Sequence, residues 1–451
     1  MPRISELKRA AVSLLGSFRF RHLLRTGFPS DVGIQNSQSS AWLADGPTID
    51  GNRHTLDRIL TKNIVPFWYP EVIDTNHGGY RLNHDLQGKW KGPANKSLVT
   101  QARTVWFFSR LVNSPYRKND YLKAAAHGYE YLRERMWDRD FGGFYWEVES
   151  EGNRVAKPDK HLYGQAFGLY ALVEYAKASN ESSAGELASK LFDLLECHAH
   201  DAQHACYKEF LSREWSDMPA HSRSYLKTGA NVKSMNTHLH LLEAVTSFFY
   251  FSRVPVVKER LTELIFVLSN TVVRQSIGAC TDQHRKDWMP LVGDRNDRVC
   301  YGHDIENIWL LSEACNAAGM SNSLLMDLYR TLFAYALRYG FDRKQGGFFY
   351  AGPLRERADQ SEKVWSVQAE GMLGALQMYG LTREKIYWDC FTQTLQWLVT
   401  HQIDWVYGDW HDRIHRHGRS AGDKAGAWKG PYHNGRAVLQ CLELLGHLEK
   451  G

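Results

Sequence analysis

Apolar residues recur along most of the chain at helical spacing. In one segment Leu241, Leu242, Val245, Phe248 and Phe249 follow the i, i+1, i+4, i+7, i+8 pattern of a helix with a buried face. Two later segments repeat this kind of spacing: Ala369, Met372, Leu373 and Leu376 in the first, and Val438, Cys441, Leu442 and Leu445 in the second. In "IENIWLL", residues 305–311, apolar side chains surround the helix almost completely, which indicates a helix with hardly any face toward water.

Short segments rich in glycine and aromatic residues lie between these helices and recur six times. The residue after the small pair in each segment gives the series Tyr80, Phe144, Tyr207, Thr281, Phe348 and Trp410. The steps are 64, 63, 74, 67 and 62 residues, and the third and fourth members are degenerate. β-prone aromatic residues followed by turn residues predict a short strand–turn–strand piece in each segment.

A step of about 65 residues accommodates two helices of about 15 residues and their loops. Six such steps predict an all-α fold, an (α/α)6 barrel in which six helix pairs form a toroid with short β-hairpins in the connecting loops. A parallel α/β fold is disfavoured because strands do not alternate with single helices, and no G-x-G-x-x-G or Walker loop occurs.

The barrel is expected to form a single catalytic domain over residues 46–451. Residues 1–45 are expected to be a basic, flexible extension, since the part before Pro29 has six cations and one acid. Such an Arg-rich start is also compatible with a targeting peptide. The basic residues are Arg3, Lys8, Arg9, Arg19, Arg21 and Arg25, and the acid is Glu6.

Composition narrows the class of protein further. Of the 451 residues 43% are hydrophobic and 23% are charged, which is ordinary for a globular protein. The net charge of +5 comes from scattered residues, so no nucleic-acid partner is expected, and no apolar run is long enough to span a membrane. Seven cysteines without a metal-binding or disulfide pattern indicate a cytoplasmic protein. The protein is expected to be a monomer or a weak homodimer. The 15 Trp residues fit either a large core or a surface for sugar rings.

The predicted inner helices begin with polar clusters at corresponding places in the six repeats. Each cluster has an ordinary explanation, because Asp304 or Asn236 can cap a helix, a single His is usually a core residue, and Trp usually packs. Six together indicate a ligand site, since burying so many polar groups is otherwise unfavourable. The residues of interest are Arg103, Tyr163, Asn236, His240, His303, Glu306, Trp309, Trp365, Glu370, Trp428 and His433.

Three of these residues, His240, His303 and His433, stand at comparable positions of different repeats. Imidazole titrates near neutrality, which suits reversible proton transfer. Metal binding is the alternative, but His238 and His240 point about 200° apart on a helix. Two H-x-x-x-H pairs, at 200/204 and 411/415, border the hairpin segments instead. No metal and no cofactor are therefore expected.

The segments "NTHLHLLEA", "GHDIENIWLL", "KVWSVQAEG" and "AGAWKGPYHNGRA" resemble the N-acylglucosamine 2-epimerase superfamily, and most of all its cellobiose (mannobiose) 2-epimerase branch. The resemblance extends over about residues 55–447. It implies an (α/α)6 barrel and a metal-free reaction at C2 of a reducing-end aldose, through an enediolate, with a mono- or disaccharide substrate.

The resemblance also implies a role for each candidate residue. His303 and His433 would be the acid–base pair, and His240 would bind the substrate and assist ring opening. The remaining residues would contact the sugar: Arg103, Tyr163, Asn236, Glu306 and Glu370 through polar groups, and Trp309, Trp365 and Trp428 by stacking. The sequence departs from the family pattern at Gln101, Ser366 and Gly430, which leaves the substrate open.

Three other functions fit the same residues. An aldose–ketose isomerase shares the enediolate and differs in where the proton returns. An inverting glycoside hydrolase uses two carboxylates roughly 6.5–9.5 Å apart, and Glu306 and Glu370 are candidates, although such an enzyme has no need of three histidines. The third alternative is a sugar-binding barrel without catalysis.

Overall fold

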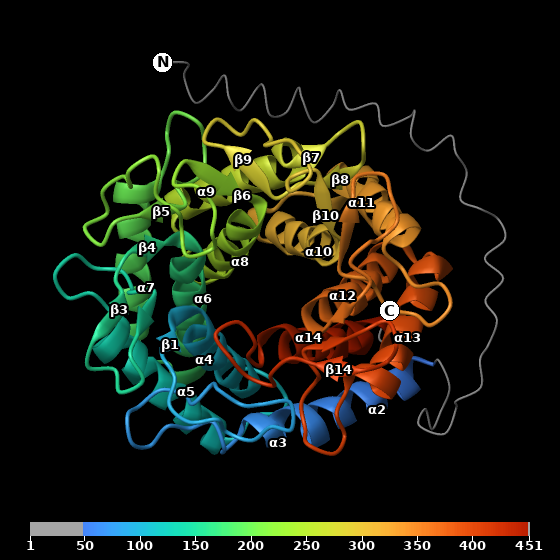
Figure 1. Cartoon of the computed structure of the whole chain (residues 1–451), viewed down its shortest axis with the longest axis horizontal. Helices are drawn as coiled ribbons and strands as arrows, with labels where there is room; N and C mark the ends of the chain where they lie inside the picture. The colour runs from blue at the N-terminus through green and yellow to red at the C-terminus, as the bar shows by residue number, and fades with distance from the viewer. Residues whose placement is uncertain (1–47, 450–451) are drawn as a thin grey trace.

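The computed structural model describes residues 48–449, and these form a closed ring of helix pairs (Figure 1). Each inner helix packs against the next, and the last packs against the first. The inner helices are α4 (Leu98–Val112), α6 (Leu162–Ser179), α8 (Met235–Ser252), α10 (Tyr301–Ala318), α12 (Trp365–Thr382) and α14 (Tyr432–Leu448). The (α/α)6 barrel expected from the sequence is confirmed.

An outer layer of helices surrounds this ring. It consists of α2 (Ile49–Ile59) with α3 (Val65–Trp68), α5 (Asn119–Tyr131), α7 (Ser182–Leu194), α9 (Pro255–Phe266), α11 (Met326–Tyr339) and α13 (Lys385–Trp397). Outer helices are amphipathic, as α11 shows by burying Leu328, Tyr329, Leu332 and Phe333 while Asp327 stays exposed. Helix α10, by contrast, is buried nearly all round, as its apolar sequence predicts.

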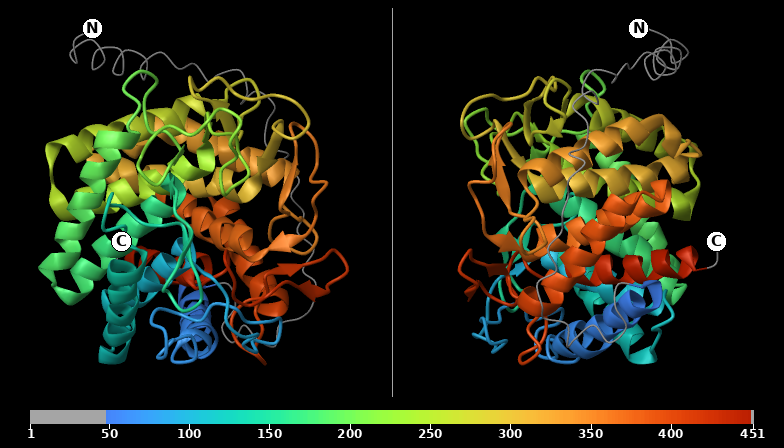
Figure 2. Two further views of the ribbon diagram at one scale, coloured as in Figure 1. Left: turned by 60° about the vertical axis from the view of Figure 1, so that its left-hand side comes forward. Right: turned by 90° about the vertical axis from the view of Figure 1, so that its right-hand side faces the viewer.

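The connecting segments that carry the strands gather at one face of the ring (Figure 2). They carry antiparallel pairings in the order β1–β2–β3, β4–β5, β6–β9, β7–β8, β10–β11 and β12–β13–β14. The first seven strands are β1 (Lys96–Ser97), β2 (Glu147–Val148), β3 (Val155–Lys157), β4 (Lys160–His161), β5 (Phe210–Leu211), β6 (Val232–Ser234) and β7 (Val273–Arg274). The others are β8 (Ala279–Cys280), β9 (Gln283–Arg285), β10 (Arg298–Cys300), β11 (Ala351–Pro353), β12 (Lys363–Val364), β13 (Arg413–Ile414) and β14 (Ser420–Ala421). Five of the strands that precede an inner helix pair with a strand of the next repeat, so the hairpins join neighbouring repeats.

Each hairpin is held by a polar side chain from the first turn of an inner helix, a contact we call the clamp. The Gln165 amide accepts a hydrogen bond from Phe144 N (2.9 Å) and donates one to Phe144 O (2.8 Å). Gln101 and Gln368 bind Tyr80 and Phe348 in the same way. His238 replaces the glutamine in the third repeat and contacts Tyr207.

The fourth and sixth clamps use shorter side chains. Asp304 accepts a hydrogen bond from Cys280 N (3.2 Å), so the repeated residue of the fourth segment is Cys280 and not the expected Thr281. In the sixth repeat Asn434 donates to the Asp409 carboxylate (2.6 Å). Part of the polarity at the inner-helix starts is therefore structural, because these six side chains satisfy hairpin groups and not a ligand.

A buried ion pair accompanies most clamps. Lys160 donates to the Asp138 carboxylate at 2.9 Å, with both side chains fully buried. The equivalent pairs are Asp74–Lys96, Asp201–Lys233, Asp342–Lys363 and Asp404–Lys424. The fourth repeat has the charges reversed, in the partly exposed pair Arg274–Asp297 at 3.1 Å.

Two further expectations concern the whole chain. None of the described helices is long and apolar enough to cross a membrane. All seven cysteines have free thiols, as their spacing predicts. The expected extension, residues 1–45, lies outside the described residues.

Candidate active site

The clamps set the same register in every inner helix. His303 and His433 each come one residue before a clamp residue, Asp304 and Asn434, so they occupy equivalent positions of α10 and α14. His240 comes two residues after its clamp and lies about one helical turn further along α8. The expected equivalence of the three histidines therefore applies to His303 and His433 alone.

The residues two positions after the clamps include most of the charged groups of the site. They are Arg103, Phe167, His240, Glu306, Glu370 and Arg436, in chain order. Helices α8, α10, α12 and α14 bring the last four of these into a hydrogen-bonded cluster, as the contacts below show.

Arg436 is the centre of this cluster. Its guanidinium is fully buried and donates to Glu370 (2.7 Å), Glu306 (2.9 Å) and Glu243 (2.5 Å). These carboxylates come from three different helices, so one cation holds α8, α10 and α12 against α14. Burial alone raises the pKa of Glu243, but Arg436 and His240 outweigh it and lower this pKa to about 2.

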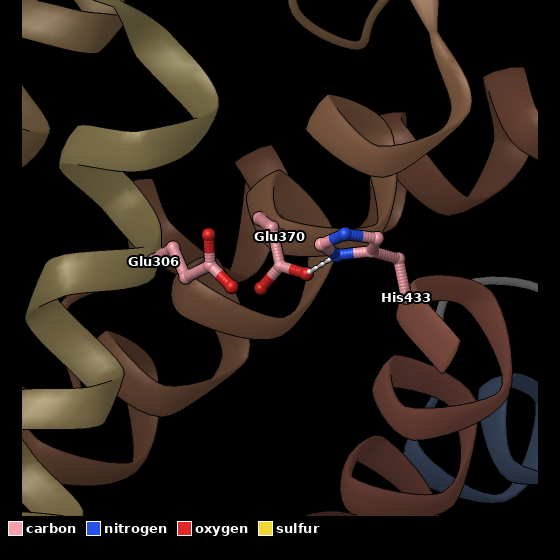
Figure 3. Close-up of side chains that lie close together, drawn as sticks. All are labelled: Glu306, Glu370 and His433. Carbon is pink, nitrogen blue, oxygen red and sulfur yellow. Dashed lines mark hydrogen bonds and ion pairs between the residues drawn. The ribbon is translucent and has the colours of Figure 1, made fainter. Parts of the chain in front are cut away.

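His433 is oriented by Glu370 (Figure 3). Its Nδ1 lies 2.7 Å from Glu370 Oε1, and Glu370 Oε2 accepts a hydrogen bond from Trp309 Nε1 at 3.0 Å. A carboxylate accepts hydrogen bonds, so Nδ1 carries the proton and Nε2 has a free lone pair. Burial and the cations Arg103 and Arg436 hold the pKa of His433 well below 6.5. His433 is therefore a neutral imidazole, suited to accept a proton.

His303 has the opposite electrostatic environment. Burial lowers its pKa, but Cys300, Glu306 and Asp282 outweigh that effect and raise the pKa to about 10. His303 is partly exposed at the third position of α10. Two equivalent histidines thus have pKa values displaced in opposite directions, as expected for an acid and a base that work together.

His240 has a carboxylate partner of its own. Its Nδ1 lies 3.1 Å from Glu243 Oε2, the oxygen that also accepts a hydrogen bond from the Tyr432 hydroxyl. Burial lowers the pKa of His240, so its Nε2 is also unprotonated. Its ring packs against Tyr163 and Phe167, with centroids 5.1 and 4.6 Å away.

Arg103 is a buried cation that has no carboxylate partner among residues 48–449. It donates to the Tyr163 hydroxyl (3.0 Å) and to the Trp428 carbonyl (3.3 Å). Its guanidinium lies 4.1 Å from the Phe167 ring centroid and 4.7 Å from that of Tyr432. Aromatic faces hold the guanidinium in place without neutralising it, so the positive charge is available to an anionic group.

The three candidate tryptophans differ in their surroundings. Trp428 is 46% exposed and lies 6.2 Å from the Tyr163 ring, so part of its surface is free to contact a ligand. Trp365 packs edge-on against His433, at 5.8 Å. Trp309 is fully buried beneath the Arg436 guanidinium and donates to Glu370, which assigns it to supporting Glu370 and not to stacking.

Asn236 lies at the start of α8, beside Asp282. Its backbone N–H donates to the Asp282 carboxylate (3.0 Å), and Asp282 is one of the groups that raise the pKa of His303. The Asn236 Oδ1 atom is buried without a partner in the described chain. Such an atom is available to a sugar hydroxyl.

Glu306, Glu370 and His433 are also the described residues best arranged for a metal ion, because their ligand atoms lie within 4.8 Å of one another. Each already has a protein partner: Arg436 donates to both carboxylates, and His433 uses Nδ1 for Glu370. A divalent ion there would have to displace the Arg436 guanidinium. The donor set therefore fits an internal charge network better than a metal, and a metal-free site stays a prediction.

Sequence reasoning did not select Arg436, Glu243 and Tyr432 as site residues, although each stands in a cluster that it considered. The helical spacing of these residues could have indicated two of them. Glu243 follows His240 by three residues and Arg436 follows His433 by three, so each pair shares a helix face.

Comparison with known proteins identifies the family. The model of N-acylglucosamine 2-epimerase matches residues 78–437, which is most of the chain. The chain belongs to this family. As a member of the N-acylglucosamine 2-epimerase family, it is an enzyme of the carbohydrate epimerase and isomerase class, and an inverting hydrolase is no longer the best interpretation of Glu306 and Glu370.

Individual relatives agree with this assignment. The cellobiose 2-epimerase of Bacteroides fragilis is 30% identical over 407 residues, which cover 87% of this chain and 98% of that protein. The D-mannose isomerase of Marinomonas mediterranea is 24% identical and covers 84% of this chain and 95% of its own. The structure of cellobiose 2-epimerase from Bacillus thermoamylovorans aligns with a TM-score of 0.80 at 28% identity, over 87% of this chain and 99% of that one.

Proposed function

We propose that this protein is a sugar 2-epimerase that acts on C2 of the reducing-end aldose of a disaccharide such as cellobiose or mannobiose. The observation that carries the proposal is the pair of equivalent histidines whose pKa values are displaced in opposite directions. The similarity to cellobiose 2-epimerases over nearly the whole chain supports it.

Inversion of C2 by proton transfer can use a base on one face of the carbon and an acid on the other, or one base and a rotated intermediate, and we propose the first of these. In the proposal, neutral His433 accepts the C2 proton through Nε2, while its Nδ1–H remains on Glu370. The protonated His303 then returns a proton to the opposite face, which inverts C2. Positioned acid–base groups of this kind typically contribute 10²–10⁴-fold to the rate.

The intermediate is an enediolate, whose negative charge develops on O1. Arg103 is the cation proposed to stabilise that charge, because it is held rigidly and has no carboxylate partner in the described chain. His240 Nε2 is proposed to assist ring opening. Tyr163, Asn236 and Glu306 are proposed to bind hydroxyl groups, and Trp365 and Trp428 to contact the sugar rings.

An aldose–ketose isomerase is the second candidate, since the chain also resembles a D-mannose isomerase. Both reactions pass through the same enediolate. In the isomerase the proton returns to C1 and gives a ketose, so the products distinguish the two functions.

The deciding experiment is incubation of the purified protein with cellobiose in deuterated water. We expect glucosyl-mannose with deuterium at C2 and no free glucose. A ketose product would support the isomerase instead, and glucose without deuterium at C2 would support hydrolysis. A parallel reaction with chelator is expected to proceed at an unchanged rate.

Asparagine variants test the two histidines. His303→Asn and His433→Asn are each expected to lower the turnover number about 10³-fold with folding retained, because each removes one proton-transfer group. His54→Asn is the matched control, since His54 is exposed on α2. Normal turnover in both active-site variants would contradict the assignment.

A further inference from the structure

The sixfold repeat allows one hairpin tip to be compared with another. In the second repeat, Arg213 follows strand β5 and reaches across to the tip of the preceding hairpin. It donates to Asp138 through Nε and Nη2 (2.9 and 3.0 Å) and to Asp140 through Nη2 (2.6 Å). An arginine at this position is thus neutralised by acids of the hairpin tip.

The same backbone positions exist between the fifth and sixth repeats. Ile414 pairs with Lys363 as Leu211 pairs with Lys160, so Arg416, two residues after Ile414, corresponds to Arg213. The tip of the fifth hairpin closes with hydrogen bonds between Asp342 and Gly346 and between Asp342 and Gly347. The second repeat has the same bonds at Asp138, Gly142 and Gly143. Lys344 therefore occupies the place of Asp140.

This replacement leaves a group of cations without acids. A pocket of about 910 Å³ lies beside this tip, and it is lined by five exposed basic residues that have no carboxylate partner in the described part of the chain. The five residues, which we call the basic pocket, are Arg338, Arg343, Lys344, Arg357 and Arg416. His401, His415 and His417 line it as well.

The one acid in the lining does not neutralise these cations. Asp342 binds Lys363 through Oδ2 at 2.9 Å and the backbone of Lys344 and Gln345 through Oδ1. Glu362 is not part of the lining and lies 3.9 Å from His415. The basic pocket therefore has an excess of positive charge that the protein itself does not balance.

We propose that the basic pocket is a binding site for a phosphate group, whose oxygens take the place of the Asp140 carboxylate. Guanidinium groups present paired N–H donors that match phosphate and carboxylate geometry, and a dianion balances two cations at once. The aromatic residues Phe341 and Phe349, both partly exposed, line the same pocket and offer a surface to a ring that carries the phosphate. The site is separate from the histidine cluster and does not depend on the proposed function.

Calorimetric titration of the full chain with pyrophosphate tests the proposal, with inorganic phosphate and glucose 6-phosphate as parallel ligands. We expect binding in 150 mM NaCl that weakens tenfold or more in Arg416→Ala. We also expect a tenfold loss in Lys344→Asp, because this change restores the Arg–Asp arrangement of the second repeat within the protein. Tighter binding of glucose 6-phosphate than of inorganic phosphate would identify a sugar-borne group, and equal binding would identify the phosphate alone.

Arg419→Ala is the matched control. Arg419 is exposed in the same hairpin and does not line the pocket, so the variant loses one charge outside it and is expected to bind within about twofold of the unchanged protein. Equal losses in Arg416→Ala and Arg419→Ala would mean that the ligands respond only to net charge, which would overturn the proposal. Absence of binding by all three ligands at 10 mM would overturn it too.

Discussion

At the scale of the residue, the site depends on two imidazoles that differ in charge at the same position of two helices. His433 is kept neutral by burial and by Arg103 and Arg436. His303 is kept protonated by Cys300, Glu306 and Asp282. The difference comes from their neighbours and not from the histidines, so it is open to test by changing a neighbour.

The dependence of kcat/KM on pH should show this difference. Activity requires neutral His433 and protonated His303, so we expect a broad plateau. Its acid limb should lie well below pH 6.5, where His433 becomes protonated, and its alkaline limb near pH 10, where His303 loses its proton.

The variant Cys300→Ser provides the control for the alkaline limb. Serine removes the sulfur atom that raises the pKa of His303, so this pKa should fall and the limb should move to lower pH. An alkaline limb that stays near pH 10 in this variant would show that Cys300 does not set the pKa of His303.

The residues proposed to touch the sugar were easier to predict than those that hold the site together. His303 and His433 stand in distinctive motifs, and polarity at the start of an apolar helix is visible in sequence. Arg436 is not distinctive, because its importance comes from Glu243, Glu306 and Glu370, which lie more than 60 residues away in the chain. The displaced pKa values likewise depend on contacts between helices.

At the scale of the element, the clamp determines which face of each inner helix points to the site. A slip of one residue at Gln101, Gln165 or Gln368 would move every functional side chain of that helix by about 100°. The clamp therefore fixes orientation as well as adding stability.

Removal of a clamp should lower the free energy of unfolding. Gln165→Ala loses two buried hydrogen bonds and leaves Phe144 N and O without partners, so we expect the free energy of unfolding to fall by about 2–4 kcal/mol in urea titrations. His238→Gln should stay within about 1 kcal/mol of the unchanged protein, since glutamine forms the clamp in three other repeats. Gln203→Ala, at an exposed hairpin tip, is the control and should change stability by less than about 0.5 kcal/mol. A loss in Gln165→Ala no larger than in that control would refute the clamp.

The periodicity of the chain predicted these elements well, and the error at Thr281 has a simple cause. In the fourth segment the small pair of the turn is Gly278–Ala279, while Cys280 is itself small and looks like part of the pair. The two degenerate segments belong to the third and fourth repeats, in which His238 and Asp304 replace the clamp glutamine. The sixth repeat also lacks a glutamine, but its segment keeps the common pattern with Asn434 as the clamp.

At the scale of the whole molecule, the ring is closed by its two ends. Helix α2 packs against α14, and the Trp68 indole donates to Asp409 at 3.0 Å. Asp409 also holds the clamp residue Asn434, next to His433. The first described helices thus support the last part of the active site.

Truncation tests this division of the chain. A variant that begins at residue 46 is expected to fold and to keep its activity, because the extension is proposed to lie outside the barrel. A variant that begins at residue 69 should fail to fold, since it exposes the surface buried by Leu56, Ile59, Leu60, Ile64 and Trp68. Far-ultraviolet circular dichroism and thermal unfolding measure both outcomes. A cooperative, active protein lacking α2 and α3 would contradict this account of closure.

The position of His433 on α14 has a consequence for biosynthesis. During translation, five complete inner helices emerge from the ribosome before His433, the proposed proton acceptor, and the apolar side of α2 that packs against α14 stays uncovered until then. Every product that terminates before α14 lacks both His433 and the helix that covers α2. Such chains are expected to be inactive and to expose apolar surface of the kind that chaperones and proteases recognise.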